Sequence, residues 1–227
     1  MAHGVSVSCP SCGVTIEDTS AHTRSLACPH CGNWVYLGSN GWESAGLFEH
    51  AIDAPSIFQL GKSGQLSQRA FVVAGRVRLS YGEDYREGFW DEWWLEFEDG
   101  NHQWLEEDDG AYRLHKSSDV GTGANSGADS LAHSQASSLT SSLTSSLAGA
   151  SVGSNLSIDG KDWFVSERLE AIVAGVQGSL PVAITPGEKV ICIDVMGNGT
   201  RLSIEASDNE VQISDSDVVR ASAFKWR

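Results

Sequence analysis

The stretch GFWDEWWLEFEDGNHQWLEE, residues 88–107, decides the fold because two alternating segments flank a turn. Phe89, Trp93, Leu95 and Phe97 all occupy odd positions before the turn. This period of two is typical of a β-strand with one buried face. The dipeptide Asp99-Gly100 readily adopts a type I′ turn, so the stretch predicts a β-hairpin with a two-residue loop.

A two-residue loop also predicts which residues of the hairpin lie opposite each other. The expected pairs are Leu95 with Trp104, Trp94 with Leu105, and Glu96 with Gln103. The expected core positions are Trp93, Leu95, Phe97 and Trp104. Aromatic side chains bury a large area per residue, so tryptophan on this face of a small sheet indicates packing.

The even positions of the first strand carry a different set of residues: Trp90, Glu92, Trp94 and Glu96. Residues 83–109 contain twelve acidic residues and one basic residue. Two interpretations stay open. In the first, Arg76 and Arg78 of the preceding strand lie beside Glu92 and Glu96, and the tryptophans pack over the arginine side chains. In the second, this acidic aromatic face binds a cation such as a polyamine through its ring faces and carboxylates.

The segments around the hairpin predict more strands and one insertion. Residues 69–81 alternate, residues 111–116 form a short strand, and short apolar runs recur after the insertion. Residues 117–157 are rich in Ser, Gly, Ala, Leu and Thr, so we interpret them as a flexible low-complexity insertion, with a short helix as the alternative. We predict a mainly β protein in which residues 55–227 form an antiparallel β-sandwich or barrel-like domain interrupted by this insertion.

Two copies of one motif precede this domain, CPSCG at residues 9–13 and CPHCG at residues 28–32. The candidate metal ligands are Cys9, Cys12, Cys28 and Cys31. Two thiolates on one ion require a sharp turn, which proline after the first cysteine and glycine after the second favour. We expect one tetrahedral Zn²⁺ ion, and four protein ligands make the site structural because they leave no open position.

The spacing of the cysteines argues against other uses of the motif. A redox Cys-x-x-Cys motif is single and lies in a βαβ unit, whereas this chain has two copies around a short hairpin-like stretch. A full set of four cysteines makes His22 and His30 unnecessary as ligands. By this local pattern residues 7–38 resemble the zinc ribbon family, and residues 39–54 are interpreted as a linker. The ribbon lacks a basic surface, so we expect it to dock on protein and not on nucleic acid.

The composition limits the classes of partner that the protein can bind and indicates its cellular compartment. The 227 residues carry a formal net charge of −15, which disfavours nucleic acid and anionic lipid and favours basic protein surfaces or cations. No run approaches the roughly 20 apolar residues that cross a bilayer, and no basic region followed by an apolar region opens the chain. Four of the five cysteines pair as Cys-x-x-Cys, which indicates metal in a reducing compartment. We expect a cytoplasmic protein without a membrane span.

Four segments of the predicted β-domain carry a further resemblance. They are WDEWWL at residues 90–95, WLEEDDG at 104–110, GSLP at 178–181 and GEKVICIDV at 187–195. Over residues 55–215 the chain resembles a bacterial family, domain of unknown function 4178, which a zinc ribbon often precedes. The resemblance implies no established catalytic residues. It also implies relatives encoded beside polyamine-synthesis enzymes and small membrane or stress proteins.

These observations lead to two hypotheses about function. Because no nucleophile elbow, phosphate-binding loop or catalytic metal triad is recognised, neither hypothesis is an enzyme. The first is a non-catalytic adaptor that presents protein-binding surfaces, in a membrane-stress or polyamine-linked complex. The second is a small-cation binder or sensor that uses the even-numbered face of Trp90, Glu92, Trp94 and Glu96.

Overall fold

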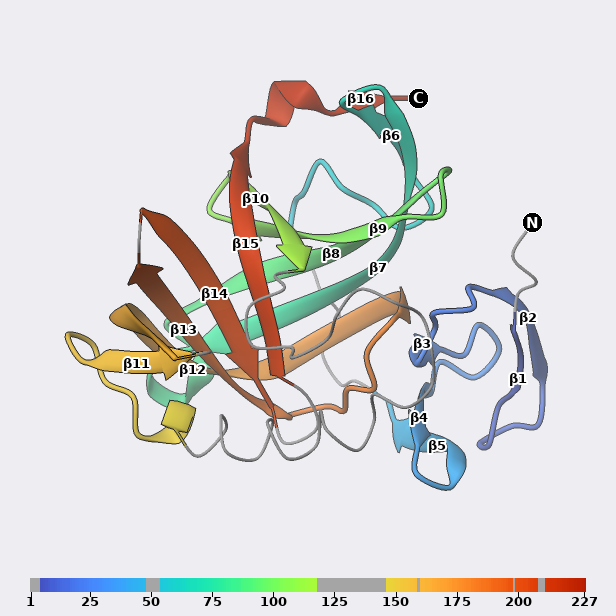
Figure 1. Ribbon diagram of the computed structural model, residues 1–227. Coiled ribbons are helices and arrows are strands. Elements are labelled where there is room, and N and C mark those ends of the chain that lie inside the picture. Colours follow the sequence, from blue (N-terminus) through green and yellow to red (C-terminus); the bar gives the residue numbers. More distant parts are fainter. Residues whose placement is uncertain (1–4, 48–53, 118–145, 159, 198, 208–210) are drawn as a thin grey trace. The chain divides into compact units, whose positions relative to one another are not determined.

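The computed structural model describes residues 5–47, 54–117, 146–158, 160–197, 199–207 and 211–227. Within these ranges the chain forms sixteen β-strands, two short 3-10 helices and one helical turn (Figure 1). The prediction of a mainly β protein with a large antiparallel sheet and an N-terminal cysteine cluster is confirmed. Contacts between Cα positions divide the chain into two compact units, and each is described by itself.

The first unit combines Met1–Leu114, Ile172–Glu188 and Val218–Arg227, and the second combines His115–Ala171 and Lys189–Asp217. The elements that lie wholly in the first unit are β1 (Val5–Ser8), β2 (Thr15–Thr19), β3 (Ser25–Ala27), β4 (Trp34–Gly38), β5 (Gly41–Gly46), β6 (Ser63–Leu66), β7 (Arg69–Tyr81), η1 (Glu83–Tyr85), β8 (Gly88–Phe97), β9 (His102–Asp108), η2 (Ala221–Ala223) and β16 (Lys225–Trp226). Those wholly in the second unit are β11 (Asn155–Ile158), β13 (Lys189–Gly197) and β14 (Thr200–Ala206). Three strands contribute residues to both: β10 (Ala111–Ser117), β12 (Lys161–Leu180) and β15 (Val211–Val219).

The cysteine ribbon of the first unit consists of a hairpin, β1 with β2, and a three-stranded segment, β3 with β4 and β5. Strand β5 lies inside the range 39–54 that the sequence indicated as a linker. Gly38 pairs with Gly41 across the connection, and a positive φ of 110° at Gly41 allows the chain to reverse within two residues. The ribbon is therefore one strand longer than predicted.

The ribbon is also joined to the last residues of β12, which belong to the same unit. Strand β3 pairs with β12 through Leu26 opposite Ser179. Two side chains of the ribbon add hydrogen bonds: the buried Ser25 hydroxyl donates to the carbonyl of Val182 at 2.6 Å, and the Trp34 indole donates to the carbonyl of Ile184 at 2.9 Å. Because these bonds replace water for buried groups, the ribbon is part of the first unit and not a separate module on a linker.

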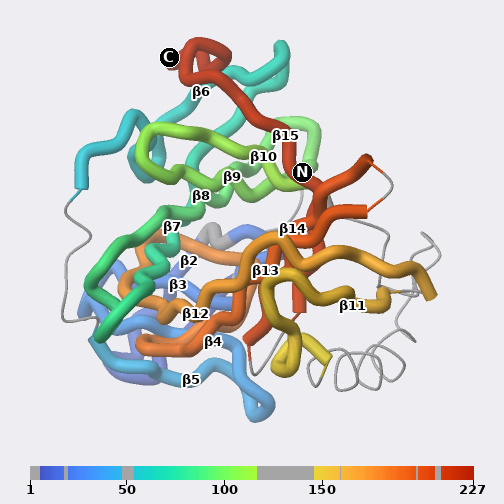
Figure 2. The backbone as a smooth tube through the Cα atoms, turned by 90° about the vertical axis from the view of Figure 1, so that its left-hand side faces the viewer, coloured from blue at the N-terminus to red at the C-terminus, as the bar shows by residue number. Residues whose placement is uncertain are grey.

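A β-bulge in β7 determines which side chains share a face with β8. The two strands run side by side in both views (Figures 1 and 2), and their register shifts between Val73 and Gly75. A bulge adds one residue to one strand, so every later side chain changes face. After the bulge Arg76 pairs with Trp93, and Arg78 pairs with Asp91. The expectation that these arginines lie beside the even-numbered glutamates is wrong for this reason.

The hairpin of β8 and β9 forms as predicted, but with a different loop and register. The amide of Phe97 donates to the carbonyl of Asn101, and that of Gly100, at a positive φ of 82°, donates to the carbonyl of Phe97. This is a three-residue loop with glycine in the left-handed region. Trp94 consequently lies opposite Trp104, and Leu95 lies opposite Gln103.

The change of register moves Trp104 to the other face of the hairpin. Trp104 is half-buried and packs against Trp94, with ring centroids 5.0 Å apart. It is not one of the buried residues of the main apolar core of the first unit, which we call the aromatic core. The predicted core residues Trp93, Leu95 and Phe97 are buried in that core. They pack there with Phe58, Phe71, Leu105, Tyr112 and Phe224, among others.

The second unit contains a separate apolar core. Its central residues come from β11 to β14 and from the single helical turn, and include Leu147, Trp163, Val165, Ile193, Val195 and Ile204. Leu147 is fully buried, and strand β11 pairs with Lys161–Phe164 of β12. Leu147 and all of β11 except its last residue lie within the range 117–157 interpreted as the insertion, so the C-terminal part of that range belongs to the folded unit. The remainder of the predicted insertion, residues 118–145, lies outside the described residues.

Candidate metal centre

The first cysteine pair lies in a tight knuckle between β1 and β2. The amide of Gly13 donates to the carbonyl of Cys9 at 2.8 Å, and the amide of Cys9 donates to the carbonyl of Val14. Gly13 has a φ of 75°, which glycine adopts without steric cost. The chain thus reverses within the motif and brings the thiols of Cys9 and Cys12 to one side.

The second pair, between β3 and β4, repeats this geometry. The amide of Gly32 donates to the carbonyl of Cys28 at 2.9 Å, the amide of Cys28 donates to the carbonyl of Asn33, and Gly32 has a φ of 73°. Identical hydrogen bonds at equivalent positions follow from the identical Cys-Pro-x-Cys-Gly sequences. The two knuckles are therefore structural as well as sequence repeats.

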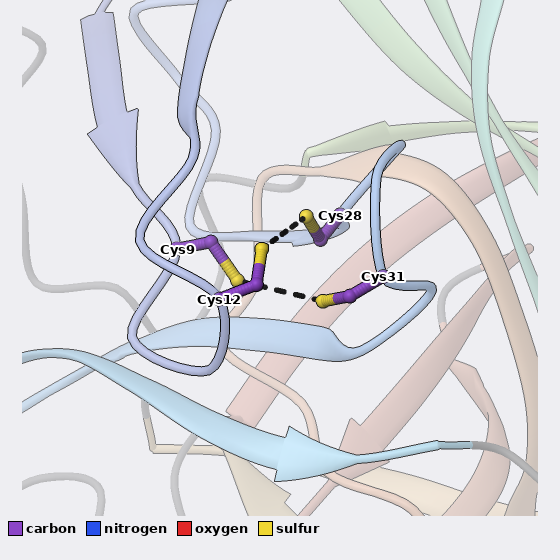
Figure 3. A group of neighbouring side chains, drawn as sticks. All are labelled: Cys9, Cys12, Cys28 and Cys31. Atoms are coloured by element: carbon purple, nitrogen blue, oxygen red, sulfur yellow. Dashed lines mark hydrogen bonds between the residues drawn. The ribbon is translucent and has the colours of Figure 1, made fainter.

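The four thiols of the two knuckles converge (Figure 3). The Sγ atoms of Cys9 and Cys31 are 3.8 Å apart, those of Cys12 and Cys28 are also 3.8 Å apart, and all four lie within 4.8 Å of one another. A tetrahedral zinc site with metal–sulfur bonds of about 2.3 Å has sulfur–sulfur edges of about 3.8 Å. The predicted set Cys9, Cys12, Cys28 and Cys31 is thus brought together in a geometry compatible with a metal site.

Burial differs among the four cysteines. Cys9 and Cys28 are buried, Cys31 is half-buried and Cys12 is exposed. The buried pair packs with Val7, Ile16 and Leu26, among others. One side of the cluster is therefore held by an apolar core, and the other side faces solvent.

The surroundings of the clustered thiols shift their pKa values in opposite directions. The backbone amide of Asn33 and, less strongly, its side-chain amide at 3.5 Å from Sγ lower the pKa of Cys31 to about 6. The hydrogen bond from the Val14 amide lowers the pKa of Cys12, but burial and the three neighbouring cysteines together raise it to about 12. A positive ion allows all four groups to be thiolates, because it cancels the repulsion between them.

The histidines near the motif are not part of this cluster. His30 is exposed in the second knuckle, and His22 has its ring against His102. Among the described residues, these four cysteines are the group of possible metal ligands whose side-chain atoms lie close together. The fifth cysteine, Cys192, is half-buried in β13 and belongs to the second unit.

The second predicted site, the even-numbered face of β8, is buried. The exposed fractions are 8% for Trp90, 7% for Glu92 and 4% for Trp94. The indole of Trp90 donates to Glu92 at 3.0 Å, and that of Trp94 donates to the half-buried Glu96 at 3.3 Å. The four residues do lie together, but their ring faces are covered and their carboxylates accept hydrogen bonds from the indoles. The two tryptophan rings of this face are therefore packed inside the fold and are not open to a cation.

The positive charges of β7 instead neutralise an acid on the opposite face. The guanidinium of Arg76 donates to Asp91 at 2.6 Å, and Arg78 binds the same carboxylate through two hydrogen bonds of 2.9 and 2.7 Å. Asp91 and Arg76 are both buried. The two guanidinium groups lie over the rings of Phe89 and Trp93. Asp91 and Trp93 both occupy odd positions in β8, so the sequence already indicated that Asp91 lies on the face of Trp93.

Sequence reasoning also missed Glu107, a half-buried carboxylate at the aromatic core. It accepts hydrogen bonds from the Trp93 indole at 2.8 Å, the Ser56 hydroxyl at 2.6 Å and the Tyr112 hydroxyl at 3.1 Å. Burial and the Glu107 charge raise the pKa of Tyr112 to about 12, so this hydroxyl stays a donor at neutral pH. Glu107 connects residues distant in sequence, and with its acceptor sites in use it is a structural acid.

The comparisons with known proteins place the chain in one family. Residues 59–221 match the family Domain of unknown function (DUF4178), which is more than half of the 227 residues, and the chain belongs to this family. No curated protein and no solved structure matches the chain. Among the described residues no helix has the length and apolar character needed to span a membrane.

Proposed function

We propose that this member of the DUF4178 family is a non-catalytic adaptor protein whose ribbon is held by one structural zinc ion. The observation that carries the proposal is the convergence of four thiols within 4.8 Å of one another. Four thiolates complete a tetrahedral shell and leave no position for water or substrate. Sulfur-rich tetrahedral sites suit zinc, with iron as the other metal of this geometry.

The connections of the ribbon support a role in assembly. Strand β3 extends the sheet at the end of β12, and the Trp34 indole is hydrogen-bonded to the carbonyl of Ile184. Metal binding supplies much of the folding free energy of so small a module. A zinc ion would therefore hold both the ribbon and the chain segment that it contacts in one conformation, which is what a docking surface needs.

Charge supports a basic protein surface as the partner. Exposed acids lie in and beside η1, at Glu83, Asp84 and Glu87, and where β9 turns into β10, at Asp108 and Asp109. Together with the net charge of −15 they favour encounter with positive surfaces and oppose encounter with nucleic acid. The cytoplasm is the compartment we propose, because it keeps thiols reduced. The membrane-stress or polyamine-linked complex that the family resemblance implies is part of the same proposal.

Elemental analysis tests the zinc site. Protein purified in reducing buffer should contain one zinc ion per chain and no iron, and Cys28→Ser should contain neither. The matched control is Cys192→Ser, which removes the cysteine outside the cluster and should keep the ion. A wild-type protein without zinc would refute the structural metal site.

Capture from native cells tests the adaptor role. The bait is the zinc-loaded protein, compared with a variant that carries Glu83→Gln, Asp84→Asn and Glu87→Gln. The control variant, Glu98→Gln, alters an exposed acid in the loop between β8 and β9. We expect a defined basic protein to be captured by wild type and control and lost with the triple variant. Equal capture by all three baits would contradict a partner bound through the acids beside η1.

A further inference from the structure

Two histidines from separate elements meet where the ribbon contacts the aromatic hairpin. His22 lies in the turn between β2 and β3, and His102 is the first residue of β9. Their ring centroids are 4.7 Å apart, with the planes tilted by 49°. Both residues are exposed, so solutes reach the rings from solvent. The fold, and not proximity in sequence, creates this pair.

A carboxylate and a rigid indole complete the surroundings of the pair. Glu96 lies directly opposite His102 in the hairpin. The ring of Trp94, which is 4% exposed, packs against the His102 ring at 4.7 Å and donates its indole hydrogen to Glu96. Trp94 therefore positions both the imidazole and the carboxylate near the turn of the hairpin.

The protonation state of His102 suits a ligand role. Burial lowers its pKa, the charge of His22 lowers it further, and Glu96 opposes the shift. At neutral pH the ring is thus the neutral imidazole, whose nitrogen lone pair binds metals.

We propose that His22, His102 and Glu96 form a second metal site, which binds a divalent transition-metal ion and bridges the ribbon to the hairpin. Two imidazoles and a carboxylate are a ligand set used by zinc with a water in the fourth position, and imidazole also suits copper and nickel. The ligand atoms of the cysteine cluster already lie within 4.8 Å of one another, whereas this second set needs side-chain rotation. The two exposed histidines change rotamer on a fast timescale, so an ion can draw their imidazoles toward the Glu96 carboxylate.

This site would have a role distinct from that of the cysteine cluster. An ion that binds only the folded arrangement stabilises it in proportion to the logarithm of its free concentration. Binding at His22 and His102 would therefore fasten the β2–β3 turn to the hairpin when the free metal concentration rises. The cysteine site would hold its ion permanently, and the histidine site would respond to the metal supply.

Zinc titration of protein that already carries one zinc ion tests the proposal. Calorimetry and elemental analysis should show a second ion on the wild type. His22→Ala and His102→Phe should each weaken its binding by about tenfold or more, and Glu96→Gln should weaken it less. Phenylalanine keeps a ring against Trp94, so His102→Phe separates loss of a ligand from loss of packing. The control is His30→Ala, which removes an exposed histidine outside the pair and should bind the second ion as the wild type does.

Each outcome decides the matter, provided that every variant retains the first ion. A wild type that takes up no second ion overturns the proposal. So does a His22→Ala variant that binds like the wild type, because the ion would then not bridge ribbon and hairpin. Equal weakening by His30→Ala would indicate adventitious binding to surface histidines and would also overturn it.

Discussion

The cysteine knuckles and the aromatic hairpin are both short motifs that the sequence displays clearly, yet only the knuckles follow the sequence in detail. In a knuckle, five residues contain the turn, the glycine and the closing hydrogen bond, as between Gly13 and Cys9. In the hairpin, the partners of Trp94 and Leu95 depend on whether the loop has two or three residues. The difference shows that the conformation of a short motif follows from its own residues when its hydrogen bonds close within it. The pairing of two strands is less certain, because one extra residue in the loop changes the whole register.

The largest effect should follow from breaking the knuckles. Cys28→Ser removes one of two buried ligands, so the metal should be lost and residues 7–46 should unfold. Because β3 pairs with β12 in the same unit, amide exchange should also rise at residues 179–184. Hydrogen exchange with mass spectrometry measures this. Unchanged exchange at residues 179–184 would show that the ribbon folds separately after all.

Removing the charge of Asp91 should have the next largest effect. Asp91→Ala leaves the buried Arg76 without its carboxylate, and loss of one partner from a buried pair costs about 3–5 kcal/mol of unfolding free energy. The matched variant is Asp99→Ala, whose ion pair with Arg69 is open to solvent, with side chains 40% and 37% exposed. That variant should unfold almost as the wild type does, since solvent screens exposed pairs. Urea denaturation of both variants distinguishes the buried pair from the exposed one.

A tryptophan pair tests the register of the hairpin directly. Trp93→Ala removes a residue that is 1% exposed in the aromatic core and should cost about 3–5 kcal/mol. Trp104→Ala removes a half-buried ring that packs against Trp94, and should cost about 0.5–1.5 kcal/mol. The two-residue loop would have placed both rings in the core. Equal destabilisation by the two substitutions would therefore favour that register over the one described.

The sequence predicts the elements well because the patterns that define strands are local. Alternation located β7 and β8, Asp99-Gly100 located the turn, and the repeated cysteine motifs located the cysteine cluster. It was wrong on features that depend on contacts between segments distant in sequence. It left the burial of Trp90 and Trp94 open, because that burial requires neighbours that no local pattern names. Strand β11 and the buried Leu147 lie in a segment whose composition resembles an insertion, but tertiary packing overrides that composition.

The bulge at Gly75 is the least visible of these features in the sequence, and a methyl group tests it. A Cβ at Gly75 would lie 2.3 Å from the carbonyl oxygen of Ser179, which is backbone and cannot move aside. Gly75→Ala should therefore cost about 1–3 kcal/mol through overpacking. Gly100→Ala is the matched control, because its Cβ meets nothing within 4 Å and only its positive φ, with a strain of about 1–2 kcal/mol, opposes the change.

If the bulge places Arg76 and Arg78 on the face of Asp91, shifting the bulge should also release that ion pair. The unfolding free energy lost by Gly75→Ala combined with Asp91→Ala should then be less than the sum of the two single losses. Additive costs in denaturation experiments would mean that the glycine serves only close packing, and that the face of the arginines is fixed elsewhere in β7.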